Sequence, residues 1–214
     1  MLTTNARSSV LLFLFFLSGF CNLVYEIVWT RMFGLVFGVT IFAVSAVLAS
    51  FMMGLAVGAF AFGRIVEKKG DPVIIFSFVH FGIFVSAAAF IAGFPFFKDL
   101  FLFINGAVDP GFYASRVILF VLAFILMIIP ATLMGATFPV AVKIFARGET
   151  LGKDVGILYS VNTAGSVAGC LIAVFFLLGS AGMKGTIWIA AALDCFIGLA
   201  ALAMLMFNSR TGAK

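Results

Sequence analysis

The sequence predicts an all-α integral membrane protein, a bundle of six transmembrane helices. Apolar residues make up 64% of its 214 residues and charged residues only 10%, whereas soluble domains carry about 25% charged residues. The apolar residues form continuous runs long enough to cross a bilayer as helices, about 20 residues each. These runs lack the strict alternation of a membrane barrel. The composition excludes an ordinary soluble domain and a disordered chain, which needs low hydrophobicity and high charge.

Each of six apolar runs predicts one span. The first follows Arg7 and shows no Ala-x-Ala cleavage site, so we interpret it as a retained helix and not as a signal peptide. The fourth contains Pro130 and Pro139, which predict a kink or a break near its cytoplasmic end. The connection 95–113 is half apolar and favours an interfacial helix on the outer leaflet. The predicted spans are residues 10–31, 38–63, 72–94, 114–143, 155–180 and 185–207.

The basic residues predict the orientation of the bundle. If the N-terminus lies inside, nine of the 13 lysines and arginines fall in inside segments and four in outside segments. Cytoplasmic loops carry an excess of Lys and Arg, so we expect both termini in the cytoplasm. Charges placed in this way are typical of a topology signal, and we expect no nucleic-acid partner. The inside residues are Arg7, Arg64, Lys68, Lys69, Lys143, Arg147, Lys153, Arg210 and Lys214, and the outside residues are Arg31, Lys98, Arg116 and Lys184.

The residues that most often bind metals are few and scattered. Cys21, Cys170 and Cys195 lie in apolar stretches without a CxxC pattern, and His80 is the single histidine. We expect the cysteines to be small buried side chains and predict no metal site and no cofactor. His80 is more typical of a core residue than of a proton relay, although intramembrane histidines do occur in transporters. No catalytic constellation is present, so we expect no enzyme activity.

Small residues recur at helical spacing in two predicted spans. Gly54 and Gly58 lie along one stripe of the second span, and Gly165 and Gly169 form a G-x-x-x-G pattern in the fifth. Such patterns allow close backbone approach between membrane helices. We favour packing within one bundle over a contact between two copies.

Two carboxylates lie within apolar spans. Glu26 is in the outer third of the first span and Asp194 is near the middle of the sixth. An aspartate at the bilayer centre costs about 2.5–3.5 kcal/mol on insertion scales, and such groups usually face the bundle interior. Polar and aromatic residues accompany them at i, i+3, i+4 and i+7 spacing on two helices. These stripes are Asn22, Tyr25, Glu26 and Trp29, and Tyr159, Asn162, Thr163 and Ser166.

The two stripes allow three interpretations. The first is internal hydrogen bonding, in which Glu26 pairs with Arg31 or accepts from Asn162, and hydroxyl groups cap Asp194. The second is a small-molecule site, because carboxylates and aromatic rings suit an amine cation. The third is a contact with a protein partner. The candidate substrate-binding residues are Asn22, Tyr25, Glu26, Trp29, Tyr159, Asn162 and Asp194.

Three stretches of the sequence read FLSGFCNLVYEIVWTRMFGLVFG (16–38), LMGATFPVAVKIFAR (133–147) and VGILYSVNTAGSVAGCLIAVFFLLGSAG (155–182). Together they resemble the membrane domain of the bacterial membrane-fused spermidine synthase-like proteins. The resemblance covers roughly residues 10–207 and implies a bacterial inner-membrane location. Family members usually continue into a Rossmann-like aminopropyltransferase domain. We expect none in this chain, which ends shortly after the sixth span, and therefore no synthase activity.

A second resemblance lies in the loop between the second and third spans. Gly63, Glu67, Lys68 and Gly70 resemble the cytoplasmic G-x-x-x-[DE]-[RK]-x-G loop of the major facilitator superfamily. The resemblance implies one six-helix half of such a transporter. Our first hypothesis for function is transport of a small cationic metabolite such as a polyamine. A half would need a second copy of itself or another membrane protein. The alternative is a non-catalytic subunit that anchors a separately encoded aminopropyltransferase-like enzyme or an electron-transfer assembly in the bilayer.

Overall fold

The computed structural model describes residues 4–38, 40–68, 70–145 and 150–211, and it confirms the all-α membrane bundle. In this part of the chain, six helical segments are long and apolar enough to cross a membrane, so the protein is a multi-pass membrane protein. The fifth segment combines a helix, a π-helical turn and a short final helix. The bounds are α1 Thr4–Phe37, α2 Ile41–Lys68, α3 Pro72–Val108, α4 Gly111–Phe145, α5 Leu151–Ile172, η2 Ala173–Leu177, α6 Leu178–Ser180 and α7 Gly182–Thr211.

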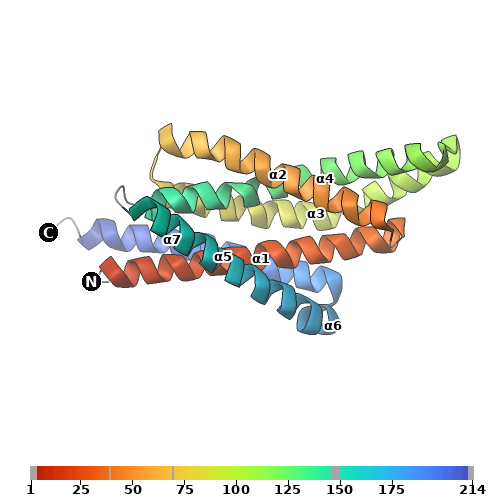
Figure 1. The fold of residues 1–214 in the computed structure, drawn as a ribbon. Coiled ribbons are helices and arrows are strands. Elements are labelled where there is room, and N and C mark those ends of the chain that lie inside the picture. The colour runs from red at the N-terminus through yellow and green to blue at the C-terminus, as the bar shows by residue number, and fades with distance from the viewer. Residues whose placement is uncertain (1–3, 39, 69, 146–149, 212–214) are drawn as a thin grey trace.

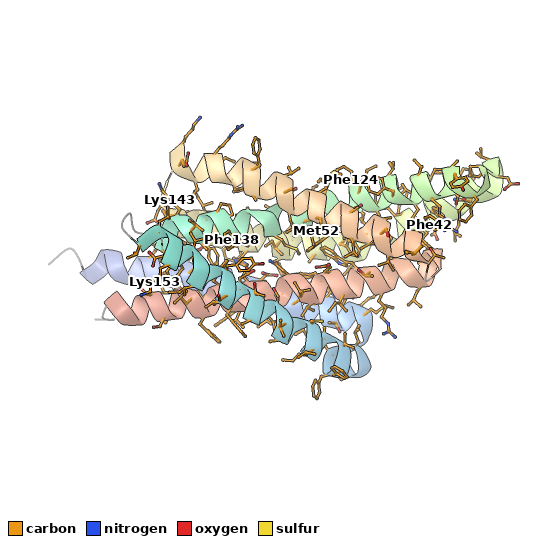
Figure 2. All side chains as sticks on the ribbon, viewed as in Figure 1. Phe42, Met52, Phe124, Phe138, Lys143 and Lys153 are labelled. Atoms are coloured by element: carbon orange, nitrogen blue, oxygen red, sulfur yellow. The ribbon has the colours of Figure 1, made fainter. Side chains whose placement is uncertain are left out.

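The helices pack in pairs that run along one long axis (Figure 1). α2 packs against α4, and α1 packs against α5. α3 contacts both α4 and α7, and α7 in turn contacts α1. The two ends of the chain lie at the same end of the bundle, as an even number of crossings requires (Figure 1). Lys143 and Lys153, both expected on the cytoplasmic side, lie toward this end, and Phe42 lies toward the other (Figure 2).

The hairpin of α3 and α4 is longer than the sequence indicates. Because α3 continues through Pro95 to Val108, the interfacial helix expected at 95–113 is wrong. The hairpin turns at Asp109, which has a positive φ of 42°, and at Gly111 with φ of 71°. At 1.5 Å per residue, helices of 37 and 35 residues are roughly 50–55 Å long, well beyond the roughly 30 Å of hydrocarbon. The tip of the hairpin therefore extends past the other helices (Figure 1).

The prolines of the fourth span do not break it. α4 runs from Gly111 to Phe145 with Pro130 and Pro139 inside it, so the break predicted at this point does not occur. Pro130 is buried in the bundle. Neighbouring helices and local adjustments can satisfy the carbonyl groups that a proline frees in a membrane helix. The irregular turn lies instead in the fifth span, at the π-helical residues Ala173–Leu177, which nothing in the sequence indicates.

The loop that resembles the major facilitator pattern is short and tightly capped. Gly63 lies inside α2, which ends at Lys68, and Gly70 adopts a positive φ of 75°. The Asp71 side chain then accepts a hydrogen bond of 2.8 Å from the Val73 backbone N–H and so caps α3. Lys69 of this pattern lies outside the described residues.

The small-residue patterns predicted in the second and fifth spans lie at contacts between helices of the same chain. A Cβ added at Gly54 would overlap Ala131 of α4, and one added at Gly58 would overlap the Thr132 carbonyl. On α5, Gly165 and Gly169 lie in the same way against the α1 backbone, at Phe16 and Phe20. The absence of a side chain therefore lets the α2–α4 and α1–α5 backbones approach closely.

Candidate functional site

A buried polar group joins three helices in the bundle interior. Asp194 of α7 accepts a hydrogen bond of 2.8 Å at Oδ2 from the Tyr25 hydroxyl of α1. Its other oxygen, Oδ1, lies 2.8 Å from Nδ1 of His80 on α3. All three side chains are fully buried. We call Tyr25, His80 and Asp194 the buried triad.

Aromatic rings surround the buried triad. Trp29, one turn after Tyr25 on α1, stacks on the Tyr25 ring at 5.4 Å between centroids and on Phe90 at 4.7 Å. Phe76 meets the His80 ring edge to face at 4.5 Å. These rings exclude water, so electrostatic interactions inside this shell are stronger than at a protein surface. Cys21, one turn before Tyr25, donates its thiol to the Ala190 carbonyl of α7 at 3.6 Å.

Four buried polar atoms in this part of the bundle have no hydrogen-bond partner. They are Nε2 of His80, Nε1 of Trp29, Oγ of Ser18 and Oδ1 of Asn22. Buried polar groups are normally satisfied, and each exception calls for an explanation such as a water or a functional role. Ser18, Asn22 and Tyr25 follow one another at i, i+4 and i+7, so they lie on one side of α1.

Glu26 lies in a separate groove on another side of α1. The groove has a volume of about 570 Å³ and is bounded by α1, α2 and the end of the fifth span. Glu26 is half-buried, and the structure records no hydrogen bond or ion pair for its side chain. The expected pairing with Arg31 or with Asn162 is therefore wrong, although Arg31 lines the same groove. The other lining residues are Leu23, Ile27, Thr30, Gly34, Leu35, Val44, Leu48, Cys170, Val174 and Leu178.

The predicted stripe on the first span therefore divides between two places. Consecutive residues of a helix point about 100° apart, so four residues at i, i+3, i+4 and i+7 cover a wide arc. Tyr25 and Trp29 point into the core, whereas Glu26 points into the groove. Asn22 is half-buried, with its amide oxygen unpartnered.

The polar stripe of the fifth span does not join the buried triad. Tyr159 is 64% exposed and contacts Phe138, so its expected place at an interior site is wrong. Asn162 donates to the Phe15 carbonyl at 3.4 Å, and Ser166 donates to the Gly19 carbonyl at 3.1 Å. The close approach at the α5 glycines brings these carbonyls within reach. Asn162 and Ser166 thus attach α5 to α1 and do not line a shared cavity.

The sequence does not predict that His80 contacts Asp194. The expectation of a satisfied core histidine is half right, because His80 is buried and contacts Asp194, yet its Nε2 has no partner. Asp194 was expected to meet hydroxyl groups, and it meets the hydroxyl of Tyr25. The available signal was the position of a lone histidine inside an apolar span.

Among the described residues, no cluster of three or more His, Cys, Asp and Glu side chains could hold a metal ion. The candidate site has two parts, the buried triad and the Glu26 groove, which lie on two sides of the same turn of α1. Comparison with protein-family models, with curated proteins and with solved structures found no match.

Proposed function

We propose that the chain is a transporter-like membrane domain that handles a small amine-bearing metabolite in the Glu26 groove. The observation that carries this proposal is an unpartnered carboxylate, half-buried within a transmembrane span and open to a groove of about 570 Å³. A charged side chain at membrane depth is costly unless it meets an opposite charge, and such residues often mark substrate pathways. An ammonium group would supply that charge.

The rest of the groove narrows the class of ligand. Its walls are mostly aliphatic, with Ile27, Leu48 and Leu178 among them, and they suit the methylene chain of an alkylamine or a polyamine. Arg31 lines the same groove and repels a second ammonium group placed beside it. The best fit is therefore a molecule that places one ammonium at Glu26, with any further ammonium group directed away from Arg31.

The wall of the groove formed by the fifth span is the one most exposed on its outer side. In the apolar stretch of the fifth span, only 17% is buried inside the bundle, against 33–44% in the corresponding stretches of the other spans. The π-helical turn Ala173–Leu177 lies in this wall, and Val174 of that turn lines the groove. π-helical turns recur at functional sites. This turn is the irregular element best placed to adjust when a ligand enters.

The proposal extends to the membrane and the assembly. It places the chain in a bacterial inner membrane, as the family resemblance implies, with both termini in the cytoplasm, as the distribution of basic residues indicates. Transporters built from repeated six-helix units bind their substrates between the units. We therefore propose that a second copy, or another membrane protein, completes the pathway against the helices that border the groove.

A binding measurement with a matched variant tests the groove. We expect Glu26→Gln to abolish the binding of putrescine or spermidine to the protein in lipid nanodiscs, because the ammonium loses its only carboxylate partner there. Isothermal titration calorimetry would measure this. Glu67→Gln makes the same change on the exposed end of α2 and should bind as the wild type does. Wild-type protein that binds neither amine up to about 1 mM, the upper end of ordinary substrate affinities, would refute the proposal.

A second function, membrane anchoring of a partner enzyme, is favoured by the α3–α4 hairpin. Near its tip it exposes Phe103 and Phe112, which are 71% and 52% exposed. Aromatic residues are enriched at protein interfaces. This function predicts a stoichiometric partner after gentle solubilisation from the native membrane, detectable by native mass spectrometry. The partner should dissociate in a Phe103→Ser and Phe112→Ser double variant, and a lone monodisperse chain would contradict it.

A further inference from the structure

We infer that Tyr25, His80 and Asp194 form a proton-binding site in the core of the bundle, with Nε2 of His80 as the atom that gains and loses the proton. This site is distinct from the Glu26 groove. The inference does not rest on transport of any metabolite, because the proton is its own ligand.

The hydrogen bonds of the buried triad determine where an added proton goes. With Asp194 ionised and His80 neutral, the Nδ1–H group donates to Oδ1 and the Tyr25 hydroxyl donates to Oδ2. Both carboxylate oxygens are then satisfied, Nε2 holds a lone pair, and the group carries one negative charge. A proton added at Nε2 makes an imidazolium paired with the carboxylate. Moving the shared hydrogen from Nδ1 to Oδ1 gives the other neutral form, and Nε2 carries a hydrogen in both.

No other charge near the triad can replace this proton. The titratable groups that face it are Cys21 and Tyr25 from α1, His80 from α3 and Asp194 from α7. Lys184, the nearest charged residue along α7 in the described chain, is ten residues from Asp194, roughly 15 Å along the helix. Glu26 and Arg31 of α1 line the groove. The side chains of Lys98 and Asp99 of α3 are exposed, pair with each other and lie 18 and 19 residues beyond His80. In α2, α4 and α5, the described charged residues lie near the helix ends, at Arg64, Glu67, Lys68, Arg116, Lys143, Lys153 and Asp154.

The buried triad carries an energetic cost both with and without the added proton, so both protonation states are accessible. Without the proton, a negative charge remains in a water-excluded interior with no cation beside it, which is unfavourable. With the proton, the charge is neutralised, but the Nε2–H group is buried without an acceptor, because Nε2 has no partner. Because Nδ1 is occupied by Asp194, the unpartnered Nε2 is the ring position left open to a proton.

The single histidine makes a direct test possible. Histidine labelled with ¹⁵N in the ring reports only His80 once any affinity tag is removed, and the two ring nitrogens have different chemical shifts with and without hydrogen. In lipid nanodiscs we expect Nε2 to change from the unprotonated to the protonated shift when the sample is taken from mildly alkaline to mildly acidic pH. Shifts that stay constant throughout would overturn the inference.

Three variants show whether Asp194 is part of the site. Asp194→Asn should abolish the transition, because an amide holds no countercharge for the imidazolium. Glu67→Gln, which removes a carboxylate at the exposed end of α2, should leave the transition unchanged. If Asp194→Asn does not fold, Tyr25→Phe gives the same information, since it removes one donor to Asp194 and should move the midpoint. A transition that persists unaltered in Asp194→Asn, or in Tyr25→Phe, would contradict the proposed site.

Discussion

Replacing Asp194 by leucine is expected to destabilise the bundle by about 1–3 kcal/mol for each buried hydrogen-bond donor that it leaves unsatisfied. The change leaves the Tyr25 hydroxyl and Nδ1 of His80 without a partner in a fully buried place. It also removes a side chain that joins α1, α3 and α7 by hydrogen bonds. Reversible unfolding in mixed micelles, followed by circular dichroism, would measure the loss.

Ser166→Ala provides the matched comparison. It removes one neutral hydrogen bond between α5 and α1, at 3.1 Å, and no charge. Interhelical hydrogen bonds in membranes average about 0.6 kcal/mol, so we expect a loss well below that of Asp194→Leu. Equal losses in the two variants would show that the buried triad behaves as an ordinary interhelical hydrogen bond.

A double substitution tests whether His80 and Asp194 contribute to stability as a pair. His80→Leu combined with Asp194→Leu leaves neither a buried carboxylate nor a buried imidazole unpaired. We therefore expect the double variant to lose less stability than the sum of the two single variants, by an amount above about 1 kcal/mol. Additive losses would show that His80 and Asp194 do not act together.

The fold was predictable because membrane helices depend on a simple physical requirement. In lipid every backbone polar group has to be satisfied within the segment, so continuous apolar runs have to form helices. The places where prediction failed are those where a local signal competed with packing. Pro95 suggested the end of a helix, yet α3 continues through it for 13 residues to Val108. The π-helical turn at Ala173–Leu177 has no proline to indicate it.

The candidate site was predictable only in part. Glu26 and Asp194 stand out in the sequence because carboxylates are rare in apolar spans. The contact between Asp194 and His80 joins residues 114 positions apart and depends on how α3 packs on α7. Helical periodicity shows which residues share a face of one helix, but it does not show which helix that face meets. For the same reason, Tyr159 has the right spacing on α5 and still points out of the bundle.

Gly165→Ala and Gly156→Ala are expected to change stability in opposite directions, although both put alanine in the same helix. A Cβ at Gly165 would overlap the Phe16 carbonyl oxygen and would lie 3.2 Å from the Phe20 amide nitrogen, both backbone atoms of α1. Backbone cannot rotate aside, so α1 and α5 have to separate. Overpacking of this kind costs roughly 1–3 kcal/mol. At Gly156 nothing lies within 4 Å, and alanine is the better helix former by up to about 1 kcal/mol.

Separation of α1 and α5 in the Gly165→Ala variant would also change the Glu26 groove. α1 contributes Glu26 to one side of it, and Cys170, one residue beyond Gly169 on α5, lies on the other. If the groove binds amines, Gly165→Ala should weaken putrescine binding as well as unfold at a lower denaturant concentration, and Gly156→Ala should do neither. Unfolding of both variants in parallel, with calorimetric binding on each, would test this. A Gly165→Ala variant as stable as Gly156→Ala would mean that α1 and α5 do not meet through their backbones, and the wall of the groove would then have to be placed differently.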